Sequence, residues 1–235
     1  SVALPEAQLP AGVPLAGPDL HRLNPDTCTV LPVALGFVEA GDPLARRTLD
    51  AIEPLWNQDW TTGGYGRYDV SSEPDSPGAW PFASVFVARA AVEAGVPERT
   101  WRVLEWLGRT AGGAAGSFFE NYGPRATPPF PQVGIVPWTW AEVVTLVVHH
   151  VLGIRPDGGG VRIRPRLLPG LDHCTARFPI GTSSLRLDVV RDGGRKTPLA
   201  RVRLDGRRVE ERESDDVTVP CTAGEVGVEL ILPGA

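Results

Sequence analysis

The chain has 235 residues, a formal net charge of −5 and 42% hydrophobic residues, enough apolar material for a packed core, which excludes a disordered chain. Residues 1–153 carry a net charge of −7 and residues 154–235 a net charge of +2, so neither part has the strongly basic field that nucleic-acid binding needs. The longest apolar run, residues 143–148, is too short to span a membrane. We therefore expect no nucleic-acid partner and no membrane partner.

The sequence starts at Ser1 and contains no methionine, so we expect a trimmed chain or part of a longer protein. Its three cysteines, Cys28, Cys174 and Cys221, are far apart and show no metal-binding spacing or disulfide framework. We expect no cofactor and no metal, and the sequence leaves the cellular compartment open.

The first helical signals come early in the chain. Residues 1–24 are rich in proline, alanine and glycine, and we expect an extended segment there. An apolar stretch follows as far as Gly41. Asp42 and Pro43 then supply an N-cap and a proline at the first helical position. The buried stripe predicted for this second helix is Leu44, Leu49, Ile52 and Leu55.

Three further helices are predicted before residue 154. The third covers about residues 79–94, and Pro97 opens the fourth. The fifth covers about residues 137–152 and stops at Gly153. One face of the fourth helix is predicted to carry Val103, Trp106 and Leu107.

After Gly153 the periodicity changes from helical to alternating apolar and charged residues. This predicts an antiparallel β unit of about six strands, arranged as a sandwich or as part of one. Hairpin turns are expected at residues 192–194 and at residues 205–206. The fold class is thus mainly α followed by β, with domains at 1–153 and 154–235.

Unusual polar and aromatic residues gather in two long loops, residues 57–78 and 112–136, and at the start of the fifth helix. Loops of this length inside a helical domain are more often functional than accidental. Indole faces suit the apolar faces of sugar rings, and charged groups suit sugar hydroxyls. Simpler interpretations remain open, since residues 63–66 could form an ordinary turn and Glu120 could be an exposed loop charge.

Four motifs occur in order: Gly-Gly-Tyr-Gly-Arg-Tyr at residues 63–68, Trp-Pro at 80–81, Ser-Phe-Phe-Glu-Asn-Tyr at 117–122 and Trp-Thr-Trp-Ala-Glu at 138–142. Together they resemble the glucoamylase-like glycoside hydrolases with an (α/α)6 toroid, over about residues 25–153. The junction to the β unit resembles the C-terminal β domain of α-L-rhamnosidases. The resemblance implies a partial (α/α)6 toroid of about five helices, followed by a C-terminal antiparallel β-sandwich-like domain.

The resemblance also implies an inverting glycoside hydrolase acting on an oligosaccharide or glycoside, with Glu120 as the general base and Arg67 holding sugar hydroxyls. Inversion needs an acid and a base about 6.5–9.5 Å apart. The acid of that family precedes these motifs, so we expect the rest of the toroid as a partner and an isolated chain that is inactive. The other candidate substrate-binding residues are Trp60, Tyr65, Tyr68, Trp80, Asn121, Tyr122 and Trp138.

Three alternatives stay open. Asp59, Asp69 or Glu73 could act as a local acid. A glycoside phosphorylase would need a basic phosphate cradle, for which Arg67 and Arg125 are the candidates. A non-catalytic carbohydrate-binding module would use the tryptophan-rich loops without turnover.

Overall fold

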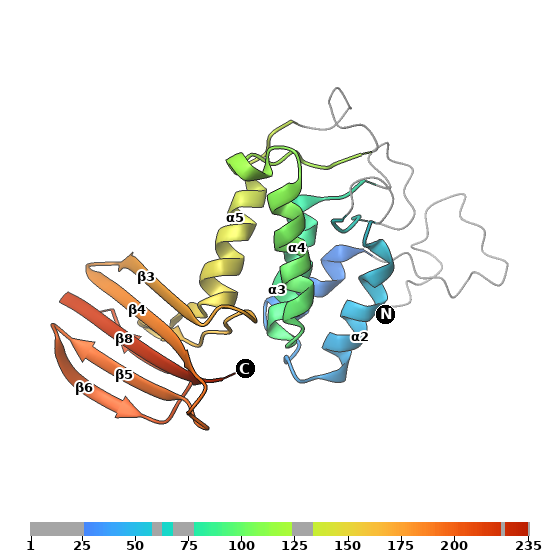
Figure 1. Cartoon of the computed structure of the whole chain (residues 1–235). Helices are drawn as coiled ribbons and strands as arrows, with labels where there is room; N and C mark the ends of the chain where they lie inside the picture. The colour runs from blue at the N-terminus through green and yellow to red at the C-terminus, as the bar shows by residue number, and fades with distance from the viewer. Residues whose placement is uncertain (1–25, 58–62, 68–77, 124–133, 222–223, 235) are drawn as a thin grey trace. The chain divides into compact units, whose positions relative to one another are not determined.

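The computed structural model describes residues 26–57, 63–67, 78–123, 134–221 and 224–234 (Figure 1). Its contacts divide the chain into two compact units, Ser1–Glu142 and Val143–Ala235. We call them the helical unit and the strand unit. In the part of the chain that is described, no helix is long and apolar enough to cross a lipid bilayer.

Among the described residues, five α-helices precede the strands, as the sequence predicts. One short 3-10 turn, Thr27–Val30, precedes the first helix, and two others, Glu53–Leu55 and Gly113–Ala115, follow the second and the fourth. The helices are α1 (Leu31–Ala34), α2 (Pro43–Ile52), α3 (Pro81–Glu93), α4 (Pro97–Arg109) and α5 (Trp138–Thr145).

The first predicted helix is much shorter than its apolar stretch suggests. A 3-10 turn capped by Asp26 leads into the four residues of α1. Gly36 then adopts a φ of +80°, a left-handed conformation that ends a helix. Hydrophobic content alone therefore overstated the helix that was expected to reach Gly41.

The second helix forms where its capping signals place it. The Asp42 carboxylate accepts a hydrogen bond of 2.8 Å from the Leu44 amide, and Pro43 is the first helical residue. Ala45, Leu49 and Ile52 are buried at helical spacing, whereas Leu44 is 37% exposed. The prediction for Leu44 is wrong because it lies one residue, and so about 100°, away from the buried face.

Helices α3 and α4 form the core of the helical unit. Most of α3 is buried, and α4 packs against it. Val103, Trp106 and Leu107 of α4 are all buried, in agreement with the shared face that the sequence predicts. The Thr100 hydroxyl ties the two helices together with a buried hydrogen bond of 2.9 Å to the Ala88 carbonyl. Beyond α5, the helical path continues as a π-helix over Leu146–Val151.

The strand unit contains two sheets that share one apolar core. A three-stranded antiparallel sheet has the order β1-β2-β7. A five-stranded sheet has the order β3-β4-β8-β5-β6 (Figure 1). The strands are β1 (Ile154–Asp157), β2 (Gly160–Ile163), β3 (His173–Ile180), β4 (Ser183–Asp192), β5 (Leu199–Leu204), β6 (Arg207–Arg212), β7 (Val217–Pro220) and β8 (Gly224–Pro233).

Three details of the predicted β unit are wrong: the number of strands, the antiparallel pairing throughout and the hairpin at residues 192–194. The described strands number eight rather than about six, and β4 pairs with β8 in parallel, so the unit is not antiparallel throughout. Residues 205–206 do connect the paired strands β5 and β6. Residues 192–194 do form a turn, in which the Gly194 amide donates a hydrogen bond to the Asp192 carboxylate. The strands on either side of this turn, β4 and β5, are not paired with each other, because β8 lies between them. A turn signal does not reveal which strands later become neighbours.

Candidate functional site

Four chain segments in the loop region form a short ladder of main-chain hydrogen bonds. The Asn57 amide donates to the Gly64 carbonyl, and the Trp80 amide donates to the Tyr65 carbonyl, both at 2.9 Å. Ala79 and Tyr122 exchange two hydrogen bonds of 2.9 and 2.8 Å. The ladder therefore brings together three of the motifs that are far apart in the sequence.

Gly63 and Gly64 allow this ladder to lie directly on the Trp106 indole of α4. A Cβ atom at Gly64 would be 2.4 Å from Trp106 Cζ2, and one at Gly63 would be 2.7 Å from Trp106 Cδ1. Both glycines also have positive φ, +150° and +81°. Close approach of the backbone to an aromatic ring explains the glycine pair.

Arg67 and Trp80 meet beside the ladder. The Arg67 guanidinium carbon lies 5.4 Å from the centroid of the Trp80 ring, within the range of a cation–π contact. Trp80 packs edge-on against Phe82, and Phe82 packs in the same way against Trp138. Trp138 is 40% exposed. A chain of aromatic contacts thus runs from Arg67 to the start of α5.

Glu120, Asn121 and Tyr122 stand together but have different surroundings. The Tyr122 hydroxyl donates a hydrogen bond of 2.6 Å to the Ala111 carbonyl, and its ring packs against Trp106. Burial raises the pKa of Tyr122. The Asn121 Nδ2 atom is buried and has no hydrogen-bond partner within the described ranges. Tyr122 therefore fixes the loop, whereas Asn121 keeps a donor for another group, and Glu120 is partly exposed next to it.

Tyr65 lies under the ladder and is fully buried. Its hydroxyl donates a hydrogen bond of 3.0 Å to the Glu53 carboxylate and accepts one from Arg102. Burial raises the pKa of the Tyr65 phenol well above its usual range. Arg102 also forms an ion pair of 2.6 Å with Glu53 and stacks over Trp56. These contacts place Tyr65 in the scaffold of the site.

Sequence reasoning missed two charged groups that hold this region. Glu53 also pairs with Arg99, which lies one helical turn before Arg102 on α4. Arg89, within the buried part of α3, pairs with Glu142 of α5 at 2.5 Å. The signal for Arg89 was available, because a charge in the middle of an otherwise apolar stretch requires a partner. For Glu53, the only signal was that Arg99 and Arg102 are three residues apart, so that both lie on one side of a helix.

Several predicted site residues lie outside the described residues. They comprise two candidate substrate-binding aromatics, the three local carboxylates and one candidate phosphate ligand: Trp60, Tyr68, Asp59, Asp69, Glu73 and Arg125.

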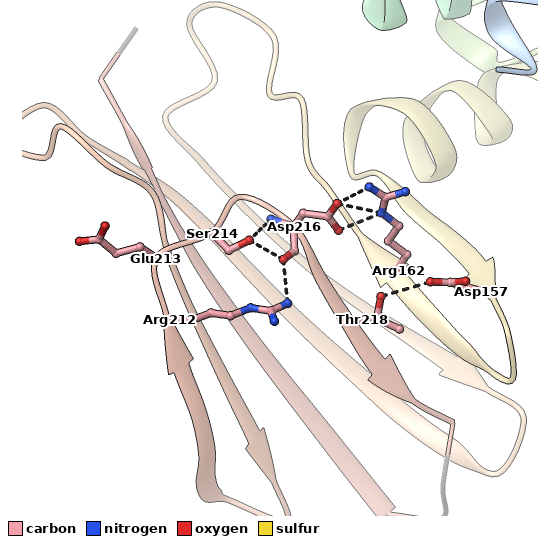
Figure 2. Close-up of a pocket in the computed structure, with 7 residues that line it drawn as sticks. All are labelled: Asp157, Arg162, Arg212, Glu213, Ser214, Asp216 and Thr218. Atoms are coloured by element: carbon pink, nitrogen blue, oxygen red, sulfur yellow. Dashed lines mark hydrogen bonds and ion pairs between the residues drawn. The ribbon is translucent and has the colours of Figure 1, made fainter. Parts of the chain in front are cut away.

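The strand unit has a polar pocket of its own, between β2, β7 and the β6–β7 connection (Figure 2). Arg162 Nε bonds to both carboxylate oxygens of Asp216 at 3.0 and 2.9 Å, and this lowers the pKa of Asp216. Ser214 donates to the Asp216 carbonyl at 2.6 Å, and Thr218 donates to Asp157 at 3.3 Å. Much of the hydrogen-bonding capacity of the pocket is thus used within the protein.

No protein-family model matches the sequence, and no curated protein matches it. Among the residues that the structure describes, no group of three or more histidine, cysteine, aspartate or glutamate side chains could hold a metal ion. The site in the helical unit is therefore interpreted from its own geometry.

Proposed function

We propose that this chain carries the general base and part of the sugar-binding site of an inverting glycoside hydrolase. The observation that carries the proposal is the main-chain ladder, because it joins the segments of Arg67, Trp80 and Glu120 at the start of α3. The proposal includes the finer architecture, in which α1 to α5 belong to an (α/α)6 toroid and the two sheets form a sandwich.

Each side chain has a role that suits its surroundings. The Arg67 guanidinium, stacked on Trp80, presents planar N–H donors to sugar hydroxyls. The Asn121 amide adds a buried donor. Trp138 offers an exposed indole to the apolar face of a sugar ring. Glu120 activates the water that attacks the anomeric carbon, and the general acid comes from another part of the toroid.

Replacing the base tests the catalytic role. In a preparation that hydrolyses glycosides, Glu120→Gln should lower turnover by about 10²–10⁴-fold while binding of the sugar persists. Glu105→Gln is the matched control, because Glu105 is an exposed carboxylate on α4 that pairs only loosely, at 3.6 Å, with Arg109. Near-normal turnover by Glu120→Gln would remove Glu120 from the mechanism.

Assays of residues 1–235 alone test whether the acid lies elsewhere. This chain should bind a sugar, detected by tryptophan fluorescence, without hydrolysing it, and Arg67→Gln should weaken that binding. Robust hydrolysis by residues 1–235 alone would contradict the proposal that the general acid lies in another part of the toroid. Sugar binding that never leads to turnover, even when an acid-bearing segment is supplied, supports a non-catalytic module instead.

A further inference from the structure

The five-stranded sheet carries a row of arginines across its outward face. Cα register aligns Arg177 of β3 with Arg186 of β4, Arg186 with Gly227 of β8, Gly227 with Arg203 of β5, and Arg203 with Arg208 of β6. All four arginines are exposed. Arg186 lies between the buried core residues Leu185 and Leu187, Arg203 follows the core residue Val202, and Arg177 lies between the partly buried Ala176 and Phe178. We call these four side chains the arginine row.

The arginine row is unfavourable for the sheet by itself. Arg177 stands directly opposite Arg186, and Arg203 directly opposite Arg208, and like charges in such positions destabilise a strand pair. Salt bridges offset this for Arg186, with Asp188 at 3.0 Å, and for Arg208, with Glu211 at 2.9 Å. An external anion would remove the remaining repulsion.

Two members of the row are open to such an anion. Neither Arg177 nor Arg203 forms an ion pair within the portion of the chain that is described. One of them lies on each side of Gly227. Each therefore keeps its N–H donors for a ligand.

The geometry of the row suits an extended ligand. Neighbouring strands lie about 4.8 Å apart, so the row crosses the sheet over about 19 Å. Gly227 sits at its centre without a positive φ, and a Cβ atom there would lie at an ordinary 3.6 Å from Arg203 Cβ. Neither backbone conformation nor crowding requires a glycine at this position. Its effect is to leave the middle of the row without a side chain.

A second row, rich in carboxylates, lies beside the first on the same face. Register aligns Asp188 with Glu229, Glu229 with Arg201, and Arg201 with Glu211. Each of these carboxylates pairs with an arginine of one of the two rows, but a carboxylate has about four acceptor sites and can still accept a hydrogen bond from a hydroxyl group. Arginines, in turn, bind carboxylates with two parallel hydrogen bonds. Side by side, the two rows match a chain that bears both hydroxyls and carboxylates.

We propose that the arginine row binds a linear acidic polysaccharide, a polyuronate, through its carboxylates. A polyuronate carries one charge on each sugar and several hydroxyls, which fits both rows. A nucleic acid fits less well, because its dense phosphates would meet the carboxylates of Asp188, Glu229 and Glu211 and a unit with a net charge of only +2. The inference does not depend on catalysis in the helical unit.

Binding of polygalacturonate to the full chain, measured by titration calorimetry, tests the proposal. Wild type should bind this polymer and not its carboxyl-reduced, neutral form. Arg177→Gln combined with Arg203→Gln should weaken binding about tenfold and flatten its salt dependence. These substitutions leave the two salt bridges of the row intact.

The matched control removes the same charge elsewhere in the strand unit. Lys196 lies in the β4–β5 connection. Arg207 pairs with Leu204, which pairs with the core residue Val226, so Arg207 does not belong to the arginine row. Lys196→Gln combined with Arg207→Gln should therefore leave the affinity within about twofold of wild type. Circular dichroism confirms that both variants are folded.

Four results would overturn the inference. They are no binding by wild type, equal binding of the neutral polymer, equal losses in the two double variants, or tighter binding of a single-stranded oligonucleotide through the same arginines. Glu120→Gln should leave polygalacturonate binding unchanged, so the outcome is separate from that of the catalytic proposal.

Discussion

Arg89 of α3 and Glu142 of α5 form an ion pair of 2.5 Å, and the Arg89 side chain is only 8% exposed. A guanidinium buried to this degree needs a counter-charge. Glu142→Gln keeps the shape of the side chain but removes that charge, so we expect unfolding to become easier by about 3 kcal/mol. Urea unfolding of the two proteins measures the difference.

The exposed pair between Glu105 and Arg109 provides the comparison for that experiment. Its side chains are 59% and 80% exposed, so solvent screens the attraction and Glu105→Gln should cost less than about 1 kcal/mol. Equal losses in the two variants would show that burial does not set the strength of the Arg89–Glu142 pair.

Gly64→Ala should destabilise the ladder. Alanine at this position combines a φ of +81° with a Cβ atom 2.4 Å from Trp106, so we expect a loss of about 3 kcal/mol or more from strain and displacement of the indole. Gly36→Ala is a matched control, because Gly36 has a φ of +80° and no atom within 4 Å of its Cβ position. It should lose only about 1 kcal/mol. Thermal unfolding measures both, and similar losses would contradict the steric explanation.

Asp216 should make the strand unit pH-dependent. Its pKa is lowered in the folded state, mainly by the hydrogen bonds from Arg162. Its stabilising contribution is therefore complete above the unfolded pKa of about 3.9 and is lost as the pH falls through the lower folded value. Wild type should exceed Asp216→Asn in stability by about 1 kcal/mol at pH 7, and the gap should close in acid. When Arg162 is also replaced by glutamine, the stability difference between Asp216 and its asparagine variant should be small at every pH. A difference that remains would mean that a group other than Arg162 stabilises the Asp216 carboxylate.

The sequence predicted the parts of the fold that depend on local signals. Asp42 and Pro43 begin α2 because capping needs only neighbouring residues. Val103, Trp106 and Leu107 lie on the buried face of α4 because helical spacing fixes that face. The pairing of β8 with β4 could not be predicted, since the alternation of residues 224–233 is the same beside any neighbour.

The same distinction between local signals and contacts of distant segments applies to the candidate site. The order of the motifs pointed to Arg67, Trp80 and Glu120, and the ladder joins the segments that carry them. The surroundings of Tyr65 and Tyr122 were not predictable, because an aromatic residue in a loop has the same sequence pattern whether it faces solvent or core. Their partners, the Glu53 carboxylate and the Ala111 carbonyl, come from other parts of the chain.

The position of β8 has a consequence for how the protein is made. It follows the other seven described strands in the sequence, yet it lies in the middle of the five-stranded sheet, between β4 and β5. During synthesis, β3-β4 and β5-β6 can each form as a hairpin while still on the ribosome. The sheet itself can close only when residues 224–233 have emerged from the exit tunnel. Until then, the facing edges of β4 and β5 lack their partner strand, and an unpaired edge of this kind can pair with another chain.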